Sequence, residues 1–284
     1  MVNSEAIVPL VSFPKSGNTW MRFLLANVFK RDDEAVIDFK TVNDYMPTSH
    51  TEDLQTVHSL MMDGSPVFIK EHYNYFDMPY KDFKKAIYIY RNGFDALYSY
   101  WHFTDAQSPG LYQNIEAFSR CYWRYCGHWG EHLYSWMLAP EIKDGHEVLA
   151  LSYEMLISEP LWALKEVVAF LGVDVPEEKL VKAIEASDKK NMKKLSGSGE
   201  FMKAKKKDFH FVRSGKKGDA EKHLPEKCKS KFLQNRRNFE LLVQYGYLTG
   251  EQADDTKCLE DTPFLDRWLC KWAVLKYRIK GKWR

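Results

Sequence analysis

The feature of the sequence that most constrains the fold is an abrupt change of pattern within the first thirty residues. Residues 6–13, AIVPLVSF, form a short apolar run typical of a buried strand, and residues 19–29 repeat apolar side chains at helical spacing. A polar stretch with one glycine, residues 14–18 (PKSGN), separates them. This pattern predicts a strand, a loop and a helix, the unit from which α/β folds are built.

The alternation of strand and helix patterns continues along the chain. Further strands are predicted at residues 66–70, 85–90 and 147–151. Helical patterns cover residues 94–103, 115–138, 161–171 and 227–245. We therefore predict one α/β domain over residues 1–250, with a central parallel β-sheet flanked by helices. In such sheets, ligands bind where the carboxyl ends of the strands meet the loops that follow.

Composition limits the classes of protein to which the chain can belong. With 45% hydrophobic and 15% aromatic residues, it has enough apolar surface for a packed core and an aromatic pocket. The sequence has no leader pattern, and no apolar stretch reaches the ~18 residues of a membrane span. Five cysteines without a Cys-x-x-Cys pair are typical of buried or idle thiols in a reducing compartment. We therefore expect a cytoplasmic protein with no integral membrane segment.

The net charge of +2 hides an uneven distribution. Residues 189–217 contain eleven Lys or Arg and two acidic residues, so this segment carries +9 and the remainder −7. Such a segment suits a polyanionic ligand, or it is a solvated charged loop. We interpret residues 189–207 as a mobile basic loop, and we expect no nucleic-acid partner.

The loop after the first predicted strand has the properties of an anion site. Gly17 allows a close approach of the backbone, and the free amides at the start of the following helix attract negative charge. Lys15, Ser16 and Thr19 add an ammonium group and two hydroxyls. The Walker A pattern is absent, because the lysine precedes the glycine and no lysine–hydroxyl pair is placed to hold Mg²⁺. A metal-dependent nucleoside triphosphatase is therefore disfavoured, and we expect no metal.

Residues 13–20, FPKSGNTW, closely resemble the 5′-phosphosulfate-binding motif of sulfotransferases that use 3′-phosphoadenosine 5′-phosphosulfate (PAPS). The resemblance implies a P-loop-like sulfotransferase fold. It also implies that Lys15 contacts the bridging oxygen of PAPS and that Trp20 stacks on the adenine. The 5′-phosphate would be held by Ser16, Gly17, Asn18 and Thr19. Asn18 stands where the family usually has threonine, and it can still form hydrogen bonds.

A second motif begins at the end of a predicted strand. Arg91 and Ser99 lie eight residues apart, in a segment that resembles the family's 3′-phosphate motif. A guanidinium group suits bidentate phosphate binding. The alternative, that Arg91 only pairs with Asp95, is disfavoured because the two motifs occur in the expected order, about 75 residues apart. Tyr153, in the segment SYE, resembles a tyrosine that reaches the adenine in the family.

A fourth segment extends the resemblance toward the carboxyl terminus. Residues 211–219, FVRSGKKGD, resemble the family's Arg-Lys-Gly-x-x-Gly-Asp element, which wraps the 3′-phosphate. The resemblance implies cofactor contacts for Arg213, Ser214 and Gly215. Because Ser214 replaces the family's lysine, it cannot supply a charge, and Lys216 is the candidate that compensates.

Sulfuryl transfer needs a base for the proton of the acceptor. His72 is our candidate, because the pKa of imidazole lies near the working pH. Residues 69–72, IKEH, resemble the family's Lys-Thr-His at a strand end, with Glu71 in place of the threonine. We expect Glu71 to face a cationic acceptor or solvent. Lys15 and Lys70 are expected to stabilise the departing bisphosphate.

The resemblance therefore implies an enzyme that transfers a sulfuryl group from PAPS, as co-substrate, to a hydroxyl or amine of a small-molecule acceptor. Its acceptor pocket is expected to be lined by Tyr73, Tyr75, Phe76, Trp101, Phe103 and Tyr112. The alternatives are a catalytically silent nucleotide-binding or scaffold protein and a phosphotransferase. The family's short dimerisation motif has no clear counterpart, so the oligomeric state is left open.

Two other sequence patterns, a pair of histidines and a basic tail, lie outside the four motifs of the resemblance. His128 and His132 have a spacing that can bind zinc, but the order His-Glu-x-x-His is not met, and metal binding is disfavoured. Residues 251–284 form a basic tail, and from residue 264 its apolar residues share one helical face. This tail is expected to dock onto its own domain or a partner, or to contact an anionic membrane surface.

Overall fold

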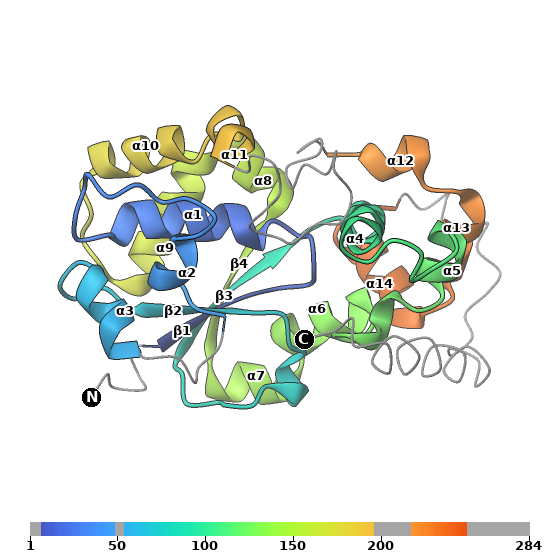
Figure 1. Cartoon of the computed structure of the whole chain (residues 1–284). Coiled ribbons are helices and arrows are strands. Elements are labelled where there is room, and N and C mark those ends of the chain that lie inside the picture. Colours follow the sequence, from blue (N-terminus) through green and yellow to red (C-terminus); the bar gives the residue numbers. More distant parts are fainter. Residues whose placement is uncertain (1–6, 49–53, 196–216, 249–284) are drawn as a thin grey trace.

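The computed structural model describes residues 7–48, 54–195 and 217–248. Its centre is a four-stranded sheet with the order β2-β1-β3-β4, in which every pair of neighbours is parallel (Figure 1). The strands are β1 (Ile7–Ser12), β2 (Val67–Glu71), β3 (Lys85–Tyr90) and β4 (Glu147–Ser152). The predicted α/β fold with a central parallel sheet is confirmed, and each predicted strand lies within one residue of its expected bounds.

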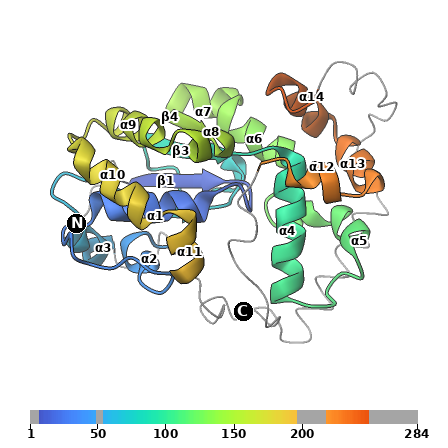
Figure 2. The ribbon, with the colours of Figure 1, turned by 90° about the horizontal axis from the view of Figure 1, so that it is seen from above.

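Helices surround this sheet. They are α1 (Asn18–Phe29), α2 (Val42–Tyr45), α3 (Leu54–Leu60), α4 (Gly93–Gln107), α5 (Ile115–Ser119), α6 (Trp129–Met137), α7 (Pro140–Gly145), α8 (Tyr153–Ser158), α9 (Pro160–Leu171), α10 (Glu177–Ala186), α11 (Lys189–Leu195), α12 (Asp219–His223), α13 (Glu226–Leu233) and α14 (Arg236–Gln244). Two short 3₁₀ helices are η2 (Tyr75–Asp77) and η3 (Tyr122–Arg124). Figure 2 shows α4, α12 and α13 grouped beside the sheet, away from α1 and α10.

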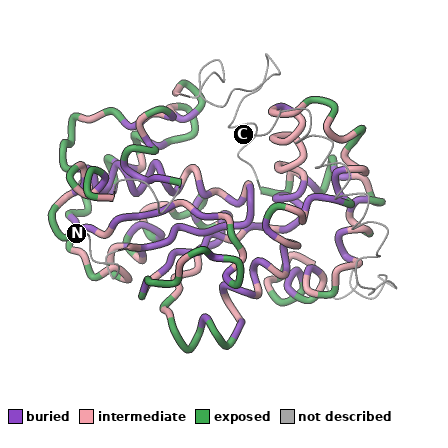
Figure 3. Tube along the Cα trace, turned by 60° about the horizontal axis from the view of Figure 1, so that its bottom comes forward, coloured by how far each residue is buried: buried purple, intermediate pink, exposed green. Residues whose placement is uncertain are grey.

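Both faces of the sheet are buried, each in its own hydrophobic core. In β1, Leu10 packs in the core formed with α1, α9 and α10, whereas Val11 packs in the core formed with α4, α6 and α13. Ile87 and Tyr88 alternate between the two cores in the same way along β3. Figure 3 shows the central strands as the most continuously buried part of the trace. Burial on both faces explains why these strands read as nearly continuous apolar runs.

The parallel register brings the carboxyl ends of the strands to one edge of the sheet. The last paired residues are Val11 with Glu71, Ser12 with Ile89, and Tyr90 with Ser152. His72, Arg91 and Tyr153 follow directly after these strands and therefore leave the sheet at the same edge. The chain passes from β1 to β2 on one side of β1 and then to β3 on the other side. The boundary between β1 and β3 is therefore a topological switch point, the place where α/β sheets bind ligands.

Two predicted long helices prove to be broken. Residues 115–138 form α5, η3 and α6, and Gly127, in a left-handed conformation with φ 80°, precedes α6. Residues 227–245 are divided between α13 and α14, because Asn235 caps α14 by accepting a hydrogen bond from the Asn238 N–H. The predicted basic loop is also wrong in part: residues 189–195 form α11, whose Met192 is buried in the core. Residues 196–207 lie outside the described residues.

Among the described cysteines, Cys121 departs from the sequence interpretation. Cys121 takes part in a disulfide, whereas Cys126 and Cys228 are buried free thiols. The interpretation of the cysteines as buried or idle thiols is therefore wrong for Cys121. Within the described ranges, no helix is long and apolar enough to cross a membrane. The predicted tail, residues 251–284, lies outside the described residues, so its separation from the domain stays a prediction.

Helices α6 and α14 pack against each other at Gly130. The Gly130 N–H donates a hydrogen bond to the buried Asn238 Oδ1 at 2.6 Å. A Cβ atom on Gly130 would lie 2.5 Å from the Asn238 nitrogen and 2.6 Å from the Arg237 carbonyl oxygen, both backbone atoms. Glycine is therefore required where the two helix backbones meet, although it lowers intrinsic helix propensity.

We predict that Gly130→Ala lowers the free energy of unfolding by about 1–3 kcal/mol, the usual cost of overpacking. The matched control is Gly145→Ala in α7, where an added Cβ meets no atom within 4 Å. This control should leave stability unchanged or raise it by up to ~1 kcal/mol. Urea unfolding of both variants measures the difference, and equal stabilities would contradict the packing argument.

Candidate active site

The loop between β1 and α1 contains two residues in left-handed conformations. Gly17 has φ 106° and Lys15 has φ 68°, the one positive φ outside glycine in the described ranges. The Ser16 N–H donates to the Phe13 carbonyl at 3.2 Å and closes the turn. Left-handed non-glycine residues are strained and are concentrated at functional sites. The turn leads directly into the first N–H groups of α1, which have no partner within the helix.

Ser16 is suited to a ligand that accepts or donates hydrogen bonds. Its side chain is completely buried, and its Oγ has no hydrogen-bond partner among the described residues. A buried hydroxyl without a hydrogen-bond partner destabilises the folded protein. An oxygen of a bound anion would accept its hydrogen bond and remove this penalty. This side chain therefore fits the phosphate role that the sequence predicts for it.

The next residues of the motif have different surroundings. The Asn18 Nδ2 donates to the Leu10 carbonyl at 3.0 Å and ties α1 to β1, so this side-chain amide serves the fold. Thr19 is partly buried at the start of α1. The Trp20 Nε1 donates to the Ser187 carbonyl at 2.8 Å, which fixes the indole against the end of α10.

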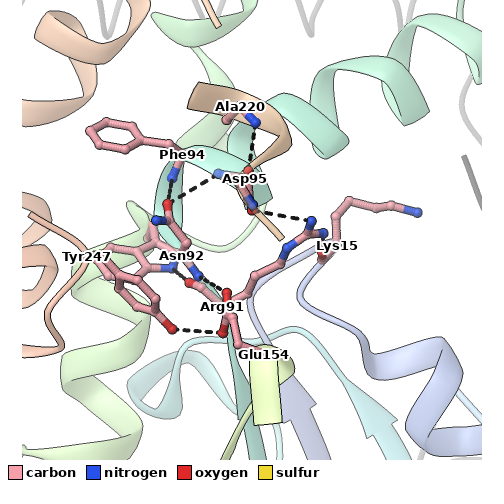
Figure 4. A network of polar contacts seen from close by, with 10 residues as sticks. Lys15, Arg91, Asn92, Phe94, Asp95, Glu154, Ala220 and Tyr247 are labelled. Atoms are coloured by element: carbon pink, nitrogen blue, oxygen red, sulfur yellow. Dashed lines mark hydrogen bonds and ion pairs between the residues drawn. The ribbon is translucent and has the colours of Figure 1, made fainter. Parts of the chain in front are cut away.

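Arg91 joins the end of β3 to this loop (Figure 4). Its guanidinium is buried, and its Nη1 donates to the Lys15 carbonyl at 3.1 Å. Its Nη2 lies 3.7 Å from Asp95 Oδ2, so the alternative pairing considered from the sequence exists, although this separation exceeds hydrogen-bond length. Ser99 lies one turn beyond Asp95 on α4 and is partly buried.

Tyr153 contacts both parts of the site. A Cβ atom on Gly17 would lie 2.6 Å from the Tyr153 ring, so the ring covers the loop closely. The Arg91 guanidinium carbon lies 4.3 Å from the centre of the same ring, a cation–π distance. Tyr153 therefore connects the end of β4 to the elements that carry Lys15 and Arg91.

Cations gather at this edge of the sheet. Burial, followed by the charges of Arg91 and Lys70, lowers the pKa of Lys15 to about 7. Burial, followed by the charge of Arg22, lowers the pKa of Lys70 to about 8. These shifts mean that positive charge here is poorly solvated and mutually repelling. A polyanion bound at this edge would relieve both effects.

His72 lies at the end of β2 with one ring nitrogen committed. Its Nδ1 lies 2.7 Å from the Ser12 carbonyl oxygen, so Nδ1 carries the proton and donates it. The Nε2 of the neutral ring is then a hydrogen-bond acceptor. Burial, followed by the charge of Lys70, lowers the pKa of His72 well below its ordinary value. The ring is therefore neutral at pH 7, as a base must be.

His132, weighed above as a zinc ligand, instead supports His72. It is completely buried, and its Nε2 donates to the His72 carbonyl at 3.2 Å while its Nδ1 accepts from the Tyr88 hydroxyl at 2.8 Å. His128 Nδ1 bonds to the Tyr122 hydroxyl at 3.1 Å. Within the described ranges no group of three or more His, Cys, Asp or Glu side chains could hold a metal. Sequence spacing gave no signal for the supporting role of His132.

Glu71 is buried, so the expectation that it faces solvent is wrong. Only 4% of the residue is exposed, and its Oε1 accepts a hydrogen bond from the Tyr80 hydroxyl at 3.3 Å. Burial raises the pKa of its carboxyl to about 7, against the opposing effects of Tyr80 and Lys70. The other expectation, that Glu71 faces a cationic acceptor, stays a prediction.

The aromatic residues expected to line the acceptor pocket fall into separate groups. Tyr75 is buried at 4% exposure and its ring packs on Trp136, so it belongs to the core. Tyr73 and Phe76 are exposed. Phe103 contacts the site directly, because the Lys15 Nζ lies 4.4 Å from its ring centre. Trp101 and Tyr112 are partly buried, and both rings pack on Phe118.

Arg213, Ser214, Gly215 and Lys216 lie outside the described residues, so their predicted contacts stay predictions. The chain is described again from residue 217, where Gly218 and Ala220 donate backbone hydrogen bonds to Asp95.

Two further polar residues near Arg91, Glu154 and Tyr247, were not identified as site residues from the sequence. The Glu154 carboxylate accepts from the Asn92 N–H at 3.2 Å and from the Tyr247 hydroxyl at 3.0 Å (Figure 4).

Comparison with known proteins identifies the class to which this fold and site belong. The family model of the sulfotransferase domain matches residues 7–238, and the chain therefore belongs to the sulfotransferase family, whose enzymes use PAPS. The family recognised from the motifs is thereby confirmed.

Individual relatives have low sequence identity to this chain but match most of its length. Human sulfotransferase 1C2 is 24% identical over 234 residues, 76% of each chain. Cytosolic sulfotransferase 7 of Arabidopsis thaliana is 28% identical over 247 residues, 76% of this chain and 73% of that protein. The crystal structure of mouse sulfotransferase SULT7A1 complexed with PAP has a TM-score of 0.58 and 21% identity, and the match covers 95% of this chain and 89% of that one. The last likeness establishes the fold.

His72 and His132 lead to a prediction about pH. The pKa of His132 is lowered to about 3 by burial, and that of His72 is also lowered. At about pH 6, where an ordinary histidine is largely protonated, NMR should show both rings neutral in the folded protein. Because the unfolded chain takes up these protons first, stability should fall as the pH decreases through about 6.5. A His72 midpoint near 6.5 would contradict this account.

Proposed function

We propose that the protein transfers a sulfuryl group from PAPS to a hydroxyl or amine of a small-molecule acceptor. The observation that carries the proposal is the meeting of Lys15, Ser16 and Arg91 where the ends of β1 and β3 adjoin. An ammonium, a buried hydroxyl without a partner among the described residues and a guanidinium form a site for a ligand with phosphate groups. The PAP complex of the mouse relative supports the choice of nucleotide.

The residues that would hold PAPS come from four segments of the chain. For the 5′-phosphosulfate we propose Lys15, Ser16, Gly17, Asn18 and Thr19, with Asn18 acting through its backbone N–H. For the adenine we propose Trp20 and Tyr153. For the 3′-phosphate we propose Arg91, Ser99, Arg213, Ser214 and Gly215.

In the reaction, an acceptor oxygen or nitrogen forms a bond to sulfur while the bond from sulfur to the bridging phosphate oxygen breaks. His72 Nε2 takes the proton that the acceptor loses, since His72 Nδ1 already donates to Ser12. The negative charge that develops on the leaving phosphate oxygen is stabilised by Lys15 and Lys70. A bound phosphate raises the depressed pKa of both lysines and keeps them charged for this role. No residue in this scheme acts through a metal.

The rival function is a nucleotide-binding or scaffold protein without turnover. The neutral, oriented ring of His72 favours an enzyme, because its Nε2 is left as the acceptor that a catalytic base requires. A phosphotransferase is disfavoured by the loop sequence, which lacks the Walker A arrangement that holds Mg²⁺.

We also propose a cytoplasmic location and a peripheral role for the basic tail, residues 251–284. The name of the Arabidopsis relative supports the location. The disulfide at Cys121 argues against it, because disulfides are rare in reducing compartments. For the tail we propose docking onto the domain or a partner, with contact to an anionic membrane surface as the alternative.

Nucleotide preference tests the proposed function without knowledge of the acceptor. Only a site for a 3′-phosphate should favour 3′-phosphoadenosine 5′-phosphate over 5′-AMP. With Arg91, Arg213 and Ser99 as its donors, the preference should be roughly 10²–10⁴-fold. Calorimetry measures both dissociation constants. Arg91→Ala should remove most of the preference, and added chelator should not change it. If the wild type binds ATP with Mg²⁺ as tightly as it binds 3′-phosphoadenosine 5′-phosphate, the proposal is refuted.

Turnover tests the assignment of the base. His72→Ala should lower sulfate transfer from radiolabelled PAPS by ~10²–10⁴-fold, the usual contribution of general base catalysis. Its affinity for the bisphosphate should stay within a few-fold of wild type, because the ring is proposed to act on the acceptor. His58→Ala on α3 is the matched control and should keep full activity. The assays require a screen of phenols, alcohols and amines as acceptors. Full turnover in His72→Ala would remove His72 from the mechanism.

A further inference from the structure

Asp95 connects two elements that are far apart in the sequence. It lies in the first turn of α4 and is only 2% exposed. Its Oδ2 accepts a hydrogen bond from the Gly218 N–H and its Oδ1 accepts one from the Ala220 N–H, both at 2.7 Å (Figure 4). A single buried carboxylate thus holds the start of α12 against α4.

The start of α12 depends on this carboxylate. Its N-cap residue, Gly218, has a left-handed φ of 75° and no side chain that could cap the helix. The first N–H groups of a helix need external acceptors, and an acidic group is the most favourable one. Asp95 supplies that acceptor from a different helix, whereas most caps come from a neighbouring residue of the same chain segment.

The same carboxylate lies beside Arg91. The separation from Arg91 Nη2 to Asp95 Oδ2 is 3.7 Å, longer than either hydrogen bond from Asp95 to α12. Arg91 in turn donates to the Lys15 carbonyl at 3.1 Å. A continuous series of contacts therefore runs from α12 through Asp95 and Arg91 to the backbone of the loop after β1.

We infer that Asp95 is a positioning residue for nucleotide binding, which docks the start of α12 beside Arg91 and fixes the guanidinium for a 3′-phosphate. The inference rests on the proposed function. Electrostatics alone makes the opposite prediction, because an acidic group next to a phosphate site repels the ligand. Removal of the Asp95 charge should then tighten phosphate binding, whereas loss of positioning should weaken it. The sign of the effect separates the two.

The test uses the full chain and two variants with complementary defects. Asp95→Asn keeps the shape but loses the charge and can accept only one of the two N–H groups, and Asp95→Glu keeps the charge but misplaces it. Calorimetry gives the dissociation constants for 3′-phosphoadenosine 5′-phosphate and for 5′-AMP. Both variants should bind the bisphosphate at least about tenfold more weakly, the effect of losing one charge-assisted hydrogen bond. Binding of 5′-AMP should change little.

Asp38→Asn is the matched control. Asp38 also accepts two backbone hydrogen bonds, from Lys40 at 2.7 Å and Thr41 at 2.8 Å, on the connection between α1 and α2. This variant is expected to lose some stability and to keep the wild-type ratio of the two affinities. A purely structural Asp95 would behave in the same way, with a lower melting temperature and an unchanged ratio.

Hydrogen exchange of the Gly218 and Ala220 amides measures docking separately, and exchange should be faster in both Asp95 variants. Tighter or unchanged bisphosphate binding in Asp95→Asn or Asp95→Glu would overturn the role of Asp95 while leaving the proposed function intact. A wild-type protein with no preference for the bisphosphate would overturn the proposed function, and the nucleotide role of Asp95 with it.

Discussion

The hydrogen bond from the Arg91 guanidinium to the Lys15 carbonyl is the contact on which the arrangement of the site depends. It is partly buried, and it joins the end of β3 to the backbone of Lys15, which has a strained left-handed φ of 68°. The ring of Tyr153 then packs on Arg91 and over Gly17, which adds the end of β4. The ends of three neighbouring strands are thus fixed to one another by contacts within the protein, and such preorganisation lowers the entropic cost of binding.

The same arrangement opposes folding at neutral pH. Lys15 and Lys70 have lowered pKa values, so the unfolded chain binds protons at these positions more strongly than the folded protein does. Their contribution to stability therefore decreases as the pH falls from about 10.5 toward 7. A dianionic ligand reverses this balance, because it restores a counter-charge where water is excluded. The stability of the protein is for this reason linked to the occupancy of its site.

The strands and the phosphate loop could be predicted because their signals are local. An apolar run is a property of six neighbouring residues, and the loop motif follows it directly. What could not be predicted depends on partners distant in sequence. Asp95 meets Gly218 across 123 residues, and the His132 ring supports the backbone of His72 across 60. The motif position of Asn18 predicts a phosphate contact but gives no sign that its side-chain Nδ2 donates to the Leu10 carbonyl. Periodicity also missed the breaks before α6 and α14, because a single left-handed glycine or capping asparagine interrupts a helix without changing the apolar spacing.

The close approach of Tyr153 to Gly17 has a consequence for how this sequence can evolve. A side chain at position 17 would have to enter space that the Tyr153 ring occupies and would also have to adopt φ 106°. A smaller side chain at position 153 would remove the clash but not the strain of the φ of 106°. Two independent constraints therefore keep position 17 as glycine, and a compensating change at position 153 can relieve only one of them.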